Sequence, residues 1–186
     1  KSMHRWHSHT RLVALLASIA LPFAAAQPRP VTAERIIAAD SEPQNWLAHG
    51  RTYGEQRYSP LKQVNDGNVE KLGLAWSYAT NSTRGLQATP IVVDGRMYAT
   101  GVWSVLYALD AKTGKELWTY DPQVPREWGR YACCDAVNRG VALWGDALYF
   151  ATLDGRLISL DARTGKQRWV INTIDRPDRR IHEVLD

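Results

Sequence analysis

Two segments of this chain repeat one another at a spacing of 51 residues. The first, Asp94–Trp118, reads DGRMYATGVWSVLYALDAKTGKELW, and the second, Gly145–Trp169, reads GDALYFATLDGRLISLDARTGKQRW. In both segments, short apolar runs are separated by turns that contain glycine. A period near ~50 residues with four short strands in each unit is typical of β-propeller blades. We therefore expect an all-β fold, a β-propeller.

The repeat also predicts individual strands and turns. Each unit contains an aspartate that can accept hydrogen bonds from the amides ahead of it, and a glycine that can take a positive φ. A tryptophan follows, which can wedge between neighbouring sheets and donate its N–H to a turn next door. In the second unit, the four expected strands are Val141–Trp144, Ala147–Thr152, Arg156–Leu160 and Lys166–Ile171. The aspartates, glycines and tryptophans of the two units are Asp110, Asp161, Gly114, Gly165, Trp118 and Trp169.

The number of blade-end tryptophans limits the number of blades. Trp76, Trp118 and Trp169 mark two to three blades, whereas propellers typically close with ~4–8. Such a chain would leave sheet edges and apolar faces exposed. We expect a fragment of a longer polypeptide, and the alternative is a chain that pairs with other subunits.

The first residues have the pattern of a secretion signal. A basic, histidine-rich start is followed by an apolar stretch and by Ala24, Ala25 and Ala26, so residues 3–26 are predicted to be a signal peptide. A retained membrane anchor is the alternative, although the apolar stretch is shorter than the ~20 residues of a bilayer span. From Gln27 onward, 20 basic side chains stand against 19 acidic ones. We therefore expect neither nucleic acid nor a membrane surface as a partner.

The remaining chain divides into three parts. Residues 27–60 are predicted to be an N-terminal arm, with a short helix within Thr32–Asp40 and tyrosines near Arg51–Leu61 docked on the core. Residues 61–176 are predicted to form the blades, starting with a short strand at Leu74–Tyr78. Residues 177–186, PDRRIHEVLD, are predicted to be a divergent tail.

Two adjacent cysteines, Cys133 and Cys134, lie between the repeats in the stretch EWGRYACCDAVNRG. Their Cα atoms should be ~3.8 Å apart, below the usual ~4.4–6.8 Å of a disulfide. A bond between them would therefore close a small strained ring. The pair could form a rigid sulfur platform under a planar ligand, or it could be two thiols without a role. Export would favour the disulfide, because the compartment is oxidising.

Several motifs together resemble one family. They are QRYSPL (Gln56–Leu61), RGLQATPIVVDG (Arg84–Gly95), the two ALDAKTGKELW-type motifs, and EWGRYACCDAVNRG with the following VALW. The chain resembles the pyrroloquinoline-quinone (PQQ)-dependent alcohol dehydrogenases, which are periplasmic eight-bladed propellers. The resemblance implies that Cys133 and Cys134 form a disulfide against the quinone. It also implies that Arg139 binds the cofactor, a role that suits a cation with a forked donor.

One position near the site departs from the family's pattern. At Gln87, well-studied members have a glutamate that contacts the cofactor. Glutamine keeps the length and can still form a hydrogen bond, so Gln87 remains a predicted cofactor-binding residue without the negative charge.

The resemblance further implies an activity. Family members oxidise primary alcohols to aldehydes with PQQ and Ca²⁺ or a lanthanide, and they pass electrons to cytochrome c. Their metal ligands and aspartate base correspond to segments outside this sequence, so we assign no catalytic or metal-binding residue and expect the chain to be inactive alone. The alternatives are a non-catalytic periplasmic propeller scaffold and a truncated gene remnant.

Overall fold

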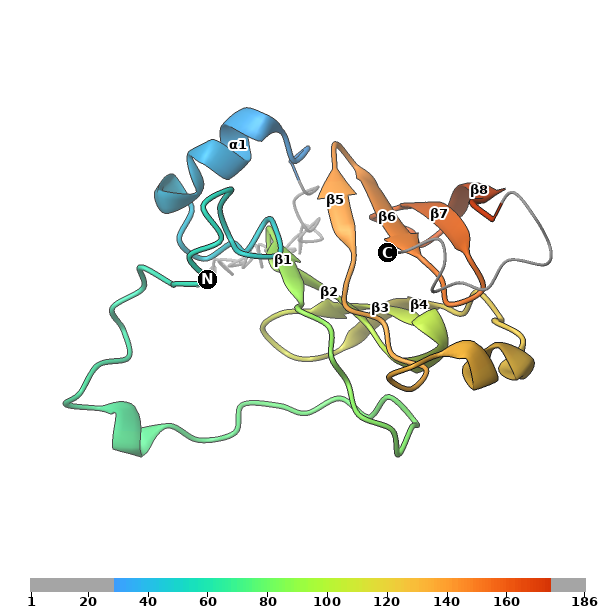
Figure 1. Ribbon diagram of the computed structural model, residues 1–186. Helices are drawn as coiled ribbons and strands as arrows, with labels where there is room; N and C mark the ends of the chain where they lie inside the picture. Colours follow the sequence, from blue (N-terminus) through green and yellow to red (C-terminus); the bar gives the residue numbers. More distant parts are fainter. Residues whose placement is uncertain (1–28, 175–186) are drawn as a thin grey trace, which may run out of the picture.

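The computed structural model describes residues 29–174, which form two four-stranded antiparallel sheets and an N-terminal arm (Figure 1). Each sheet is a meander in which consecutive strands pair, in the orders β1-β2-β3-β4 and β5-β6-β7-β8. The strands of the first sheet are Ile91–Val93 (β1), Arg96–Thr100 (β2), Leu106–Asp110 (β3) and Glu116–Tyr120 (β4). Those of the second sheet are Ala142–Trp144 (β5), Ala147–Ala151 (β6), Arg156–Asp161 (β7) and Gln167–Asn172 (β8).

These sheets confirm the predicted blades. In the second sheet, every boundary lies within one residue of the expected one. The two sheets have equivalent registers, because Tyr98 faces Ala108 and Tyr149 faces Ser159 across the same strand pair. Both sheets also have a bulge at the same place, where the third strand meets the fourth.

The predicted turn chemistry is also confirmed. The Asp110 carboxylate accepts hydrogen bonds from the amides of Lys112 and Thr113, and Asp161 accepts one from the amide of Thr164. Gly114 and Gly165 have φ values of 71° and 70°, at which a residue with a Cβ atom is strained.

The tryptophans join one repeat to the next. Trp118 on β4 donates its indole N–H to the carbonyl of Ala162 in the second sheet, at 3.3 Å, and its ring covers Gly165. In the same way, Trp76 donates to Ala111 in the first sheet and covers Gly114. The glycine is needed because a Cβ at either position would come within 2.7 Å of the indole ring. The inferred structural role is therefore confirmed for Trp118, and Trp76 has the same role. Trp169 is exposed on β8, so its role stays a prediction.

The core lies between the two sheets and under the arm. Strands β1, β3, β6 and β7 supply most of it, and one buried hydroxyl crosses it, since Tyr98 donates to the carbonyl of Ala162 at 2.9 Å. Every residue of β8 is exposed. The buried apolar side chains of the two sheets include Ile91, Val93, Tyr98, Leu106, Ala108, Leu143, Leu148, Phe150, Ile158 and Leu160.

The arm is attached to the first strand of each sheet. Val31 forms a bridge with Gly145, directly after β5, and Trp46 forms one with Val92 on β1. Between them, the helix Ala33–Ile37 (α1) begins at Thr32, whose hydroxyl caps it, and a 3-10 turn follows at Ala39–Ser41. The short helix predicted in this region is therefore confirmed.

A buried ion-pair network holds the arm to the turn after β1. The Arg35 guanidinium donates to both Glu42 and Asp94, and Asn45 binds the same two carboxylates. The Asn45 side-chain oxygen also accepts the amide of Asp94, a non-glycine residue with a φ of 47°. The arm thus fixes a turn of the first sheet.

Two predictions for residues 51–78, which lead from the arm to the first sheet, were wrong. Leu74–Tyr78 is not a strand, because no strand within residues 29–174 pairs with it, although Trp76 still docks. Tyr53 and Tyr58 are 61% and 68% exposed rather than docked. The segment that carries Tyr58 extends away from both sheets, in green in Figure 1, and includes a 3-10 turn at Val69–Lys71.

The predicted signal peptide and the predicted tail lie outside the described residues. Among residues 29–174, no helix has both the length and the apolar character needed to span a bilayer.

Candidate functional site

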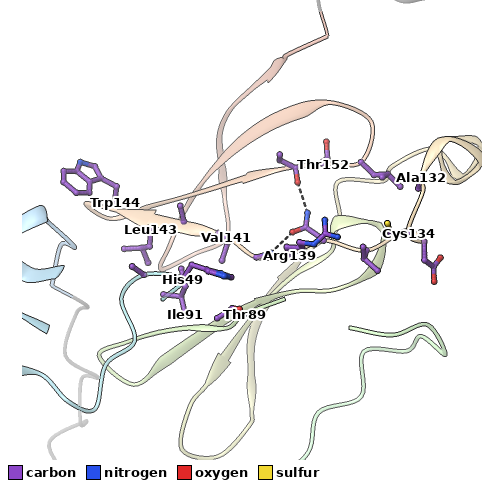
Figure 2. A pocket seen from close by; sticks show the side chains of 18 of the residues that line it. His49, Thr89, Ile91, Ala132, Cys134, Arg139, Val141, Leu143, Trp144 and Thr152 are labelled. Carbon is purple, nitrogen blue, oxygen red and sulfur yellow. Dashed lines mark hydrogen bonds between the residues drawn. The ribbon is translucent and has the colours of Figure 1, made fainter. Parts of the chain in front are cut away.

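A cavity of about 860 Å³ lies between the first strands of the two sheets, the arm and the loop that follows β4 (Figure 2). Strand β5 and the residue before it supply apolar wall, including Val141 and Leu143, and β1 supplies Ile91. The polar end of the cavity is formed by the loop segment 131–140. The volume falls within the ~300–1,000 Å³ of small-molecule and cofactor sites.

Cys133 and Cys134 lie on the loop wall of this cavity, directly after a 3-10 helical stretch at Arg126–Tyr131. Both side chains are exposed, and their sulfur atoms lie 2.7 Å apart. The hydrogen bond with the neighbouring Cys134 thiol raises the pKa of Cys133, and charge repulsion between the two sulfur atoms raises it further. Both residues are free cysteines in this structure, so the disulfide remains a prediction.

Arg139 lines the same cavity. Its backbone carbonyl accepts the amide of Thr89, which ties the loop to the chain just before β1. Gly140 follows with a φ of 139°, a conformation that favours glycine. Within residues 29–174, the Arg139 side chain forms no hydrogen bond or ion pair with another side chain, so its guanidinium is available to an anion. The structure therefore brings together three of the four predicted site residues.

Gln87 is not among the residues that line the cavity. Its side chain is exposed, two residues before Thr89, which does line it. The predicted role of Gln87 in cofactor binding therefore stays a prediction.

Other polar side chains at the cavity were not identified from the sequence. His49 reaches it from the arm, and its ring nitrogen Nε2 lies 3.0 Å from the Arg57 guanidinium. Thr152 contributes from the turn after β6. Asn138 also lines the cavity, and it belongs to the CCDAVNRG motif, which was the signal that could have identified it.

No group of three or more histidine, cysteine, aspartate or glutamate side chains that could hold a metal ion occurs in the part of the chain that the structure describes. The cavity wall in this part combines sulfur, amide, hydroxyl, imidazole and apolar groups with the Asp135 carboxylate, which pairs with Arg84. This leaves the Arg139 guanidinium and the apolar surface for a ligand. Those groups suit a planar anionic ligand, since arginine matches carboxylates and flat apolar surface matches a ring system.

Two docked blades with a cofactor-sized cavity at their first strands define a β-propeller protein with a ligand site. Residues 46–174 match a protein family described as PQQ glucose/ethanol/alcohol dehydrogenase, β-propeller domain. The chain belongs to this family of PQQ-dependent alcohol dehydrogenases, as its motifs predicted.

Individual relatives agree with this assignment. The chain is 58% identical over 163 residues to quinohemoprotein alcohol dehydrogenase ADH-IIG of Pseudomonas putida, covering 87% of this chain and 23% of the relative. The solved structure of ADH-IIG superposes with a TM-score of 0.79 over 82% of this chain and 22% of that one. A 1-butanol dehydrogenase (cytochrome c) of Thauera butanivorans is 57% identical over 129 residues, which is 69% of this chain and 19% of the relative.

A more distant solved structure has the same fold. A europium-containing methanol dehydrogenase is 39% identical, with a TM-score of 0.71 over 76% of this chain and 25% of that one. The chain thus spans about a quarter or less of the length of the relatives that it matches.

Proposed function

We propose that this chain forms one wall of the PQQ site of an alcohol dehydrogenase that oxidises primary alcohols to aldehydes. The observation that carries the proposal is the cavity that Cys133, Cys134 and Arg139 line together. When bound, PQQ would supply the group that accepts hydride from the alcohol, since the cofactor rather than the protein carries this chemistry.

Each wall residue would have a role in binding. The Arg139 guanidinium, which is free of other side-chain partners within residues 29–174, would donate to a carboxylate of the quinone. Cys133 and Cys134, joined as a disulfide, would present a rigid surface to its ring. The apolar surface around Val141 and Leu143 would exclude water from the cofactor. We assign no acid or base to the described residues.

The finer parts of the proposal concern the cofactor ion, the electron acceptor and the compartment. A Ca²⁺ or lanthanide ion bound by other residues is supported by the similarity to the europium-containing methanol dehydrogenase. Cytochrome c as the acceptor is supported by the similarity to the 1-butanol dehydrogenase (cytochrome c) of Thauera butanivorans. A periplasmic location is supported by the signal-like pattern of residues 3–26.

The test is a titration of the purified full protein with PQQ, monitored by quenching of tryptophan fluorescence. Arg139→Gln should raise the dissociation constant about 10- to 100-fold, the effect expected from losing a hydrogen bond between charged groups. Arg139→Lys should give an intermediate value, because lysine keeps the charge and loses the forked geometry.

The matched control is Arg163→Gln, which removes an exposed arginine from a turn outside the cavity. It should bind PQQ as the wild type does. Equal dissociation constants for Arg139→Gln and Arg163→Gln, or no saturable binding by the wild type, would refute the proposal.

A further inference from the structure

Two consecutive residues between β2 and β3 have an unusual backbone. Trp103 has φ 58° and ψ 24°, and Ser104 has φ 60°, so both occupy the left-handed region although neither is glycine. A conformation of this kind persists only when surrounding contacts determine it, and such residues often cluster at functional sites. The contacts of Trp103 and Ser104 lead to the cavity loop.

Trp103 is held by the loop and holds it in return. Its amide donates to the carbonyl of Ala136 at 2.8 Å. The Arg126 guanidinium lies 4.4 Å from the centre of the indole ring, and that of Arg84 lies 5.8 Å from it, both in cation–π geometry. Gly129 packs on the ring so closely that a Cβ there would come within 2.8 Å of it.

Ser104 is attached to the other end of the same loop segment. Its side chain is buried, and its hydroxyl oxygen accepts from the Asn138 side-chain amide and from the amide of Leu153, both at 3.2 Å. Asn138 donates as well to the carbonyl of Ala151 at 2.8 Å, and its own oxygen accepts the amide of Gly140 at 3.0 Å. Ser104 therefore fixes the side chain that organises the backbone around Arg139.

We propose that Trp103 and Ser104 are positioning residues that hold the segment from Cys133 to Gly140. Trp103 fixes the carbonyl two residues after Cys134, and Ser104 fixes the residue before Arg139. The paired attachment keeps the sulfur pair and the guanidinium at a constant spacing before any ligand binds. A preorganised site binds its ligand more tightly, because less ordering is left to occur on binding. The part that concerns PQQ rests on the proposed function.

The experiment measures amide hydrogen exchange by mass spectrometry in the unliganded full protein, followed by titration with PQQ. The variants are Ser104→Ala, Trp103→Ala and Trp103→Phe, the last of which keeps a ring for the two guanidinium groups. The control is Ser159→Ala. Ser159 is also fully buried, but its hydroxyl has no hydrogen-bond partner among residues 29–174, so its loss should not affect the loop.

We expect exchange in the segment 133–140 to be about tenfold faster in Ser104→Ala, which loses the hydrogen bond to Asn138. The same is expected of Trp103→Ala, which loses the indole contacts with Arg126 and Gly129 that keep its amide against Ala136. The peptides of β6 and β7 should exchange at the wild-type rate. The dissociation constant for PQQ should rise about tenfold in the same two variants. Trp103→Phe should stay close to the wild type in both exchange rate and dissociation constant, and Ser159→Ala should change neither.

Unchanged exchange of the segment 133–140 in Ser104→Ala and Trp103→Ala, or equal acceleration in all strands, would overturn the inference. If one alanine variant does not fold, the remaining variants still give this comparison. A wild type that does not bind PQQ, together with faster exchange in Ser104→Ala, would overturn the proposed function and leave the positioning role intact. Faster exchange in Ser104→Ala together with normal PQQ binding by every variant would leave the proposed function intact. It would overturn the claim that the ordered segment increases the affinity for PQQ.

Discussion

Replacing Arg35 with methionine should destabilise the protein by about 3 kcal/mol, because it leaves two carboxylates without their buried cation. The Arg35 side chain is 8% exposed, and its Nη2 lies 2.7 Å from Glu42 Oε2 and 2.5 Å from Asp94 Oδ1. Breaking a buried ion pair costs about 3–5 kcal/mol. The lower end applies because Arg29 also lies 3.0 Å from Glu42 and retains part of the attraction.

The pKa of Glu42 gives a second measure of how much the same network stabilises the folded protein. The hydrogen bond from Arg35 lowers it from 4.5 to about 2, a difference of about 3 kcal/mol. Because solvent reaches part of the network and weakens the attraction, we expect Glu42 to contribute about 2 kcal/mol to the free energy of unfolding. Because the folded-state pKa lies below the unfolded value, this stability is fully present above about pH 4.5 and is lost as the pH falls through about 2.

Urea unfolding followed by tryptophan fluorescence, at pH 7 and again near pH 3, would measure both effects. The free energy of unfolding of Arg35→Met should lie about 3 kcal/mol below the wild type at pH 7, and the gap should narrow at the lower pH. The matched control is Arg57→Met, because Arg57 forms an exposed pair with Glu55 at 3.6 Å. Its loss should cost at most about 0.5 kcal/mol. Equal losses in both variants, or a gap that does not change with pH, would refute the reasoning.

Two further predictions concern the contact between the sheets, each measured by urea unfolding. Gly165→Ala should cost about 2–4 kcal/mol, since it adds a Cβ at φ 70° and 2.7 Å from the Trp118 ring. Gly145→Ala, at φ 63° with open space around it, should cost only about 1–2 kcal/mol, and an equal loss at both glycines would contradict the packing argument. Tyr98→Phe should cost about 1 kcal/mol, because it removes one hydrogen bond to Ala162. A neutral result for Tyr98→Phe would mean that this bond contributes nothing to stability.

The blades could be predicted from the sequence because their signals are local. Each turn needs an aspartate and a glycine at fixed spacing, and each strand lies between two such turns. The one strand predicted wrongly, Leu74–Tyr78, has a docking tryptophan like the last strand of each blade, but it does not follow the aspartate–glycine turn that precedes those strands. Within residues 29–174 it also lacks the hydrogen-bonded neighbour that any strand requires.

The candidate site was predictable where its residues are adjacent in the chain. Cys133, Cys134 and Arg139 come from one motif, so their shared wall follows from sequence. His49 lies 90 positions before Arg139 in the sequence, and the bridges Val31–Gly145 and Trp46–Val92 bring the arm to the cavity. The sequence alone contains no signal for that approach.

The sequence by itself determined the propeller class, the blade boundaries, the family and the motif that carries the site, because all of these depend on residues within one repeat or one loop. The tertiary structure decided which side chains support that motif. Trp103 and Ser104 have a left-handed backbone and form hydrogen bonds with loop residues 33 and 34 positions later in the chain. That backbone is stable only because the loop, Arg126 and Gly129 surround it, and such mutual support exists only after the chain has folded.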